Sequence, residues 1–141
     1  MTQEQSIRAT FDIFKPDGVI EVRSMGAYTF SGYFKDREKL VAELMKRNDK
    51  TWYFVMNDIN DACYSREQSE RILSKKGLKT TGDKEIDQIK WILIDADPKR
   101  PSGVSSTDAE KEKAKKTIKR VYKYLCGEGF SDPVVCDSGN G

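Results

Sequence analysis

The first third of the chain contains segments of helical and of strand periodicity. Apolar side chains recur at helical spacing over residues 5–14, and the Pro-Asp-Gly sequence at 16–18 ends that pattern. Residues 19–25 and 28–34 have the composition of strands, with only a short glycine-containing connection between them. The pattern therefore predicts an N-terminal helix followed by a β-hairpin.

The middle of the chain is less regular. Asp36 is placed to cap a helix with an apolar stripe over 40–45, and residues 51–56, which are apolar on both parities, predict a central strand. Residues 66–74 are compatible with a helix. The polar, glycine-containing stretch 75–83 predicts an exposed loop.

The last third predicts a strand, a loop, a helix and a second strand. Residues 89–96 form the most apolar run of the chain, and a loop rich in proline and serine follows over 97–106. The sequence Thr107-Asp108-Ala109-Glu110 is a capping box, and the helix that it opens should end at Gly127. A short strand is expected over residues 133–136. The alternation predicts an α/β (α+β) domain, with helices packed on a mixed sheet.

The length of 141 residues suits a single domain. Within it we expect an N-terminal αβ unit at about residues 1–88 and a second unit at about 89–141. No apolar run approaches the roughly 20 residues of a membrane span, and the N-terminus lacks the layout of a signal peptide. A cytoplasmic protein that contacts no membrane is therefore expected.

Composition restricts the chemistry. The chain has no histidine, which excludes histidine-assisted triads, histidine general bases and zinc sites that need histidine. Its three cysteines, Cys63, Cys126 and Cys136, form no CxxC pair, and free thiols are expected. The net charge of +2 argues against a nonspecific basic binder but allows a locally basic face.

Asp95 and Asp97 are the main candidates for chemistry. On the predicted strand 89–96 they would project from the same face, where two close carboxylates repel each other. A hard divalent cation such as Mg²⁺ or Mn²⁺ would relieve that repulsion. A calcium loop is excluded because Arg100 stands where an EF-hand needs glycine. The alternative is a strand that ends in acidic turn residues.

The neighbours of this pair strengthen the metal interpretation. Lys99 and Arg100 follow directly, and the loop after them is rich in serine, a setting that suits a polyphosphate. A second turn, Asp137-Ser138-Gly139-Asn140-Gly141, contains glycines that would let backbone N–H groups approach phosphate. An exposed loop and an ordinary hairpin turn are the alternatives.

The run W-I-L-I-D-A-D-P-K-R-P-S-G-V-S-S-T-D-A-E-K at 91–111, followed by D-S-G-N-G at 137–141, resembles the archaeo-eukaryotic primase superfamily. It looks most like the primase-polymerases of phages, plasmids and integrated elements. Weaker similarity extends to V-I-E-V-R, F-S-G-Y-F, W-Y-F-V-M-N and T-T-G-D, at 19–23, 30–34, 52–57 and 80–83. The similarity thus covers most of the chain.

The resemblance implies template-directed nucleotidyl transfer with Mg²⁺ or Mn²⁺. Asp95 and Asp97 would be catalytic metal ligands, and Ser138, Gly139, Asn140 and Gly141 would begin the turn that binds nucleotide phosphate. The partners implied are nucleoside triphosphates, a DNA template and a downstream helicase domain. The histidine expected after Gly141 and a third acidic residue are missing. We therefore expect an N-terminal part of the catalytic module, inactive by itself and prone to self-association.

Three further features have two interpretations each. Arg23 either contacts template or pairs with Glu21, and Asn57 either contacts a nucleotide or forms a turn. The helix over 108–126 is rich in lysine and is either a solvated face or a track for a DNA backbone.

Two other functions remain open from the sequence. The first is a noncatalytic accessory module that binds DNA or a replication protein. The second is a metal-dependent nuclease, which would need more acidic ligands, with Asp83, Glu85 and Asp87 as candidates.

Overall fold

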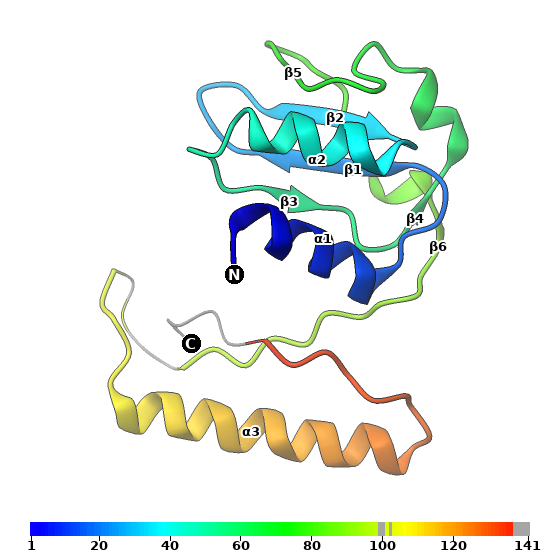
Figure 1. Ribbon diagram of the computed structural model, residues 1–141. Helices are drawn as coiled ribbons and strands as arrows, with labels where there is room; N and C mark the ends of the chain where they lie inside the picture. Colours follow the sequence, from blue (N-terminus) through cyan, green and yellow to red (C-terminus); the bar gives the residue numbers. More distant parts are fainter. Residues whose placement is uncertain (99–100, 102, 137–141) are drawn as a thin grey trace. The chain divides into compact units, whose positions relative to one another are not determined.

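The computed structural model describes residues 1–98, 101 and 103–136 (Figure 1). The chain divides into two compact units, Met1–Ile92 and Leu93–Gly141, and each is described by itself. The mixed α+β class expected from the sequence is confirmed. No helix among the described residues is long and apolar enough to cross a membrane.

The first unit begins with a helix, a β-hairpin and a second helix. These are α1 (Gln3–Phe14), β1 (Ile20–Ser24), β2 (Phe30–Phe34) and α2 (Arg37–Met45). The hairpin is antiparallel, with Ile20 opposite Phe34. The remaining elements of the unit are short: β3 (Tyr53–Phe54), β4 (Asp58–Ile59), η1 (Asp61–Ser65), β5 (Leu73–Ser74), η2 (Asp83–Glu85) and β6 (Ile86–Gln88).

The main sheet of this unit, whose residues are all described, has the strand order β3-β1-β2-β5, and β4 pairs with β6 separately. Thr2 caps α1 in a capping box, and the Asp36 carboxylate accepts two N–H groups at the start of α2, as its position predicts. Gly32 in β2 is required by close packing, because a Cβ there would lie 2.7 Å from the Arg71 carbonyl oxygen.

One face of the sheet carries the main hydrophobic core. Alternate residues of β1 and β2 point toward α1 and α2, whose apolar stripes complete the cluster. The rings of Phe11 and Phe14 meet Phe54 of β3 edge-on, with centroids 5.4 and 5.1 Å away. The buried members of the cluster are Phe11, Ile20, Val22, Phe34, Leu40, Val41, Leu44 and Ile72.

The opposite, more polar face of the sheet carries a second hydrophobic cluster, formed by Val19, Tyr33, Ile59 and Cys63, and centres on a buried carboxylate. Glu21 has a fully buried side chain and accepts two hydrogen bonds from Arg23, at 2.8 and 2.6 Å. The Ser31 hydroxyl and the Thr81 backbone N–H donate to the same carboxylate, at 2.9 and 3.1 Å. A buried charge with this many partners is compensated, and these bonds tie residue 81 to the sheet.

The network continues through Tyr33. Its hydroxyl lies 3.0 Å from the Thr81 hydroxyl and also contacts Arg66, which pairs with Glu85. Burial raises the pKa of Tyr33, and it likewise raises the pKa of the nearby Cys63 thiol. These contacts hold the irregular segment 59–88 against the polar face of the sheet.

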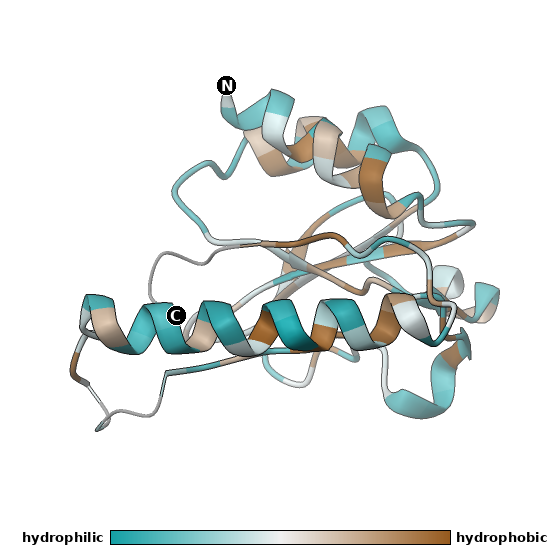
Figure 2. Cartoon of the chain, turned by 90° about the horizontal axis from the view of Figure 1, so that it is seen from below, coloured by the Kyte–Doolittle hydropathy of each residue, from teal (hydrophilic) through white to brown (hydrophobic). Residues whose placement is uncertain are grey.

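The second unit contains one long helix among its described residues, α3 (Asp108–Gly127). The predicted capping box is present, with the Thr107 hydroxyl 3.3 Å from the Glu110 N–H and the Glu110 carboxylate 2.8 Å from the Thr107 N–H. Figure 2 shows polar residues over much of the helix surface, interrupted by a few apolar positions. Of the residues of α3, only Ala114 is classed as buried.

Several expected elements differ in the structure. Residues 89–96 and 133–136 form no strand, because no described strand pairs with either. The segment 51–56 contributes β3, which is an edge strand rather than a central one because it stands first in the strand order. Its apolar residues alternate between two clusters, since Phe54 packs against the main core and Val55 against the second cluster. A helix over 66–74 is prevented by Glu70, whose φ of 54° turns the chain before β5.

Replacing Glu21 by glutamine should lower the free energy of unfolding by about 3 kcal/mol, because the substitution leaves the partly buried Arg23 without its counter-ion. Urea unfolding followed by circular dichroism measures the change. The matched control is Glu4→Gln, which removes an exposed pair with Arg8 and should cost less than about 1 kcal/mol. Equal effects of the two substitutions would refute the assigned role of Glu21.

We expect the Glu85 carboxylate to make the free energy of unfolding depend on pH in the acid range. The Gly82 N–H and the charges of Arg66 and Lys79 hold the pKa of Glu85 below its usual value, against the opposing effect of burial. A lowered pKa in the folded state stabilises the fold above the unfolded pKa of about 4.3, and that stabilisation is lost as the pH falls below it. Glu85→Gln should therefore weaken the pH dependence of unfolding below about pH 5. Parallel curves for the two proteins would contradict this.

Candidate metal and nucleotide site

Asp95 and Asp97 lie on an extended segment with no strand partner among the described residues. Both side chains are exposed, and neither has a hydrogen bond or an ion pair within the part of the chain that the structure describes. The expectation that a strand would place them on one face is therefore not met. The structure instead leaves two nearby carboxylates available to solvent.

The Asn57 side chain holds the backbone of residues 90 and 91, which precede this segment. Its Oδ1 accepts the N–H groups of both Lys90 and Trp91, at 2.9 and 2.8 Å, and its Nδ2 donates to the Trp91 carbonyl at 3.1 Å. Successive N–H groups of a strand point to opposite sides, so a single oxygen cannot accept both from a regular strand. The Asn57 side chain thus ends the regular pairing of β6 and turns the chain.

Two further contacts hold the same point of the chain. The Lys90 ammonium bridges Asp17 and Asp58, at 2.7 and 2.6 Å, and these hydrogen bonds raise the pKa of Lys90. The indole N–H of Trp91 donates to the Phe14 carbonyl at 3.2 Å, and the two rings lie 4.9 Å apart. Asn57 is therefore a structural residue that binds backbone, a role closer to the expected turn former than to a nucleotide contact.

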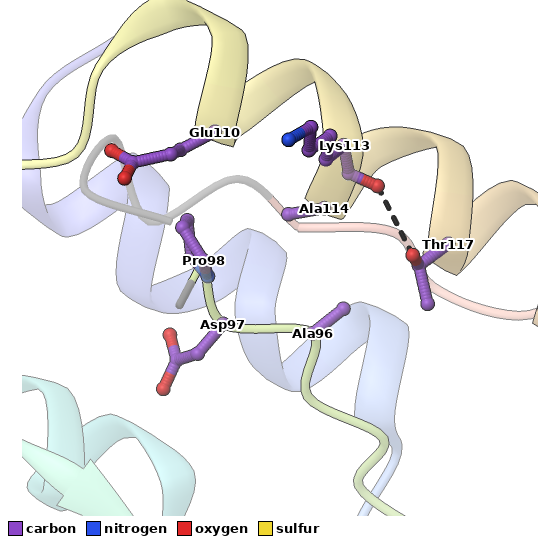
Figure 3. Close-up of a pocket in the computed structure, with 7 residues that line it drawn as sticks. All are labelled: Ala96, Asp97, Pro98, Glu110, Lys113, Ala114 and Thr117. Atoms are coloured by element: carbon purple, nitrogen blue, oxygen red, sulfur yellow. Dashed lines mark hydrogen bonds between the residues drawn. The ribbon is translucent and has the colours of Figure 1, made fainter. Parts of the chain in front are cut away.

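A cavity of about 270 Å³ lies within the second unit. Figure 3 shows the Asp97 carboxylate pointing away from α3, so the carboxylate borders the cavity rather than projecting into it. The Glu110 carboxylate is bound to Thr107, and the Thr117 hydroxyl donates to the Lys113 carbonyl at 3.1 Å. The residues that line the cavity are Ala96, Asp97, Pro98, Glu110, Lys113, Ala114 and Thr117.

Lys113 was expected only as one of several lysines on a charged helix. The structure brings it to the wall of the cavity that Asp97 borders. The sequence alone does not tell which lysine of the helix approaches the cavity that Asp97 borders. Lys113 is thus a candidate phosphate contact that sequence reasoning did not single out.

Of the two interpretations of Arg23, the structure shows the pairing with Glu21. Two of its nitrogens donate to Glu21, and its Nη2 also donates to the Thr81 carbonyl at 2.6 Å. The pairing with Glu21 anticipated from the sequence is therefore present. The guanidinium nitrogens thus bind protein oxygens, and 25% of the side chain remains exposed.

Several residues of the predicted site belong to segments outside the described ranges. The predicted phosphate contacts Lys99 and Arg100, and the turn residues Ser138, Gly139, Asn140 and Gly141, lie outside the described residues. Within the described part, no group of three or more acidic or cysteine side chains is arranged to hold a metal ion. Of the acids considered for a nuclease, Glu85 pairs with Arg66 and Asp87 accepts a hydrogen bond from Asn60.

The cations of α3 are mostly exposed. Lys115 lies 3.7 Å from Glu112, the one ion pair that is resolved between side chains of this helix. The exposed basic residues of the helix are Lys113, Lys115, Lys116, Lys119, Arg120 and Lys123. This distribution fits a solvated face and would also attract a polyanion.

Comparison of the chain with models of protein families, with curated proteins and with solved structures gives no match. The similarity to primase-polymerases therefore depends on the sequence motifs alone.

Replacing Asn57 by alanine removes three hydrogen bonds to the backbone of residues 90 and 91, made by the N–H groups of Lys90 and Trp91 and by the carbonyl of Trp91. We expect the free energy of unfolding to fall by about 1–3 kcal/mol, with a change in the fluorescence of the nearby Trp91. The control is Asn48→Ala, at an exposed position, for which less than about 0.5 kcal/mol is expected. Equal stability of the two variants would argue against the Asn57 contact.

Proposed function

We propose that Asp95 and Asp97 bind Mg²⁺ or Mn²⁺, and that this site serves template-directed nucleotidyl transfer in a primase-polymerase of a phage or mobile element. The observation that carries the proposal is the availability of the two carboxylates. They stand two residues apart, exposed, and without a cation or N–H partner among the described residues.

This arrangement favours a divalent cation for electrostatic reasons. Two carboxylates so near in the chain repel each other, and no described lysine or arginine neutralises either of them. Carboxylate oxygens are ligands that Mg²⁺ and Mn²⁺ prefer, and two of them leave coordination positions for water and phosphate oxygens. The donor set therefore fits such an ion. Bound there, it would supply the charge that stabilises a triphosphate as pyrophosphate departs.

The surroundings supply positive charge for the nucleotide. Lys113 lies on the wall of the cavity that Asp97 borders, and its charge would attract phosphate oxygens into that cavity. Lys99 and Arg100 remain proposed phosphate contacts from their place in the sequence, as does the turn formed by residues 138–141. In this proposal the aspartates hold the ion, while the basic residues hold the triphosphate against it.

The partners that follow are nucleoside triphosphates, a DNA template and a helicase domain downstream in the replication protein. Self-association is supported by a separate feature, the exposed apolar residues around the aspartates. Ile92 and Leu93 are 70% and 75% exposed, so burying them against a second copy would be favourable.

A second candidate is a noncatalytic module that binds DNA. The exposed cations of α3 favour it, because such a face would bind a phosphate backbone without any metal. The two candidates differ in one property that can be measured, which is specific affinity for a divalent cation at Asp95 and Asp97.

Manganese binding by purified residues 1–141 tests the proposal. The electron paramagnetic resonance signal of free Mn²⁺ should fall on titration with the protein, and the double substitution Asp95→Asn, Asp97→Asn should weaken binding at least about tenfold. Each tenfold change corresponds to about 1.4 kcal/mol. The matched control is Asp83→Asn, Asp87→Asn, which should leave the affinity unchanged.

Two results would overturn the proposal. Equal binding by the wild type and by the Asp95/Asp97 variant would remove the assigned ligands and favour the DNA-binding module. Loss of binding in the Asp83/Asp87 variant, with cleavage of DNA by the wild type in Mn²⁺, would move the site to those residues and favour a nuclease.

A further inference from the structure

A row of side chains crosses the polar face of the main sheet at the level of Arg23. The strand register places Tyr53 opposite Arg23, Arg23 opposite Ser31, and Ser31 opposite Leu73. Side chains directly opposite each other in neighbouring antiparallel strands have Cβ atoms about 4.5–5.5 Å apart. Tyr53 and Arg23 are therefore adjacent on this face.

Tyr53 occupies the outer end of the row and is exposed. The next residue, Phe54, turns to the other face and packs against the rings of α1, so Tyr53 must point away from the core. Its exposed fraction is 56%, and that of Met25, just beyond the end of β1, is 69%. Two large side chains on one end of the sheet are thus left uncovered.

Arg23 is held rigidly beside this tyrosine. Its nitrogens are bound to Glu21 and to the Thr81 carbonyl, yet a quarter of its side chain remains exposed. A guanidinium fixed by its edge presents a flat face, and both this face and a tyrosine ring are surfaces on which a base can stack. The sheet therefore provides a preformed stacking surface at this end.

The segment that borders the row is basic. Residues 75–84 contain four lysines, Lys75, Lys76, Lys79 and Lys84, and a single acid, Asp83. The hydrogen bond from Arg23 to the Thr81 carbonyl brings Thr81 next to the row. Lys76 follows β5, the strand at the opposite edge of the sheet from Tyr53. Lys75 pairs with Glu67 and Lys79 lies near Glu85, whereas Lys76 and Lys84 have no ion pair within the described residues. These two lysines are available to phosphate.

We propose that the end of the sheet formed by Tyr53, Arg23 and Met25 binds single-stranded DNA by stacking an unpaired base on Tyr53, with Lys84 in the segment bound to Arg23, and Lys76 beyond β5 at the opposite edge of the sheet, binding the phosphates. This inference rests on the proposed function, for which it supplies a surface for the template strand. It differs from that function in location, since every residue involved lies in the first unit.

We expect the bound DNA to be single-stranded because the exposed Tyr53 ring binds the face of a base. An exposed ring beside a guanidinium plane binds the face of a base, and base faces are accessible in single strands but are covered by their neighbours in a duplex. The surface also lies at the edge of a sheet, whereas readers of duplex DNA insert a helix or a ribbon into a groove. The lysines add attraction to phosphate that is independent of sequence.

Fluorescence anisotropy with a labelled oligo(dT) tests the proposal on the full chain. Tyr53→Ala should weaken binding about 5- to 100-fold, the effect of losing one stacked base, whereas Tyr53→Phe should retain affinity within about twofold. Tyr124→Ala, which removes an exposed tyrosine from α3, is the matched control and should bind normally. Replacing Lys76 and Lys84 by glutamine should reduce the slope of log affinity against log salt by about 1–2. Thermal unfolding of each variant verifies that it is folded.

The same assay separates this inference from the proposed metal site. The Asp95→Asn, Asp97→Asn variant should bind oligo(dT) like the wild type, so that failure of either proposal leaves the other testable. Normal binding by folded Tyr53→Ala would overturn the inference, and so would weakened binding by Tyr124→Ala alone, which assigns the DNA to α3. Tighter binding of duplex DNA, or of oligo(U), than of oligo(dT) would equally refute single-stranded DNA as the ligand.

Discussion

The buried carboxylate of Glu21 is the constraint on which the rest of the first unit depends. An ionised group inside a sheet is tolerated only when hydrogen bonds replace its hydration, and Arg23, Ser31 and the Thr81 backbone provide them. Because one of these partners is 60 residues away in the chain, the carboxylate fixes the long irregular segment on the sheet. The same bonds hold Arg23 in place, directly opposite Tyr53 in the neighbouring strand.

The proposed functions divide between two regions with different physical properties. The stacking surface in the first unit is rigid, because it lies on paired strands and its arginine is bound on one edge. The aspartates stand instead on an unpaired extended segment, whose start is held by Asn57, Lys90 and Trp91. A metal ion would there provide the order that protein contacts do not, since coordination fixes both carboxylates at once.

Charge is used in opposite ways at the two regions. In the polar face of the sheet, Glu21 and Arg23 neutralise each other and act on the fold. Asp95 and Asp97 have no such partners in the described residues, so their charge remains available to a ligand. This contrast explains why two pairs of charged residues with the same spacing, Glu21 with Arg23 and Asp95 with Asp97, receive different roles: the first pair has opposite charges and the second has two negative charges.

Local periodicity and capping residues determined the helices and the hairpin: the apolar stripe after Asp36, the capping box at Thr107 and the two strands on either side of Gly26 are all present. The same reasoning selected Asp95 and Asp97 but predicted a strand for 89–96, which the tertiary structure replaced by an extended segment. A strand needs a neighbouring strand that pairs with its backbone. Here the N–H groups of Lys90 and Trp91 bind instead the side-chain oxygen of Asn57, 33 and 34 residues earlier in the chain. Periodicity reports only neighbours in the chain. Contacts between distant segments decided three features that periodicity does not report. Arg23 pairs with Glu21 and binds the Thr81 carbonyl, Lys113 and Asp97 line the same cavity, and Tyr53 is exposed opposite Arg23.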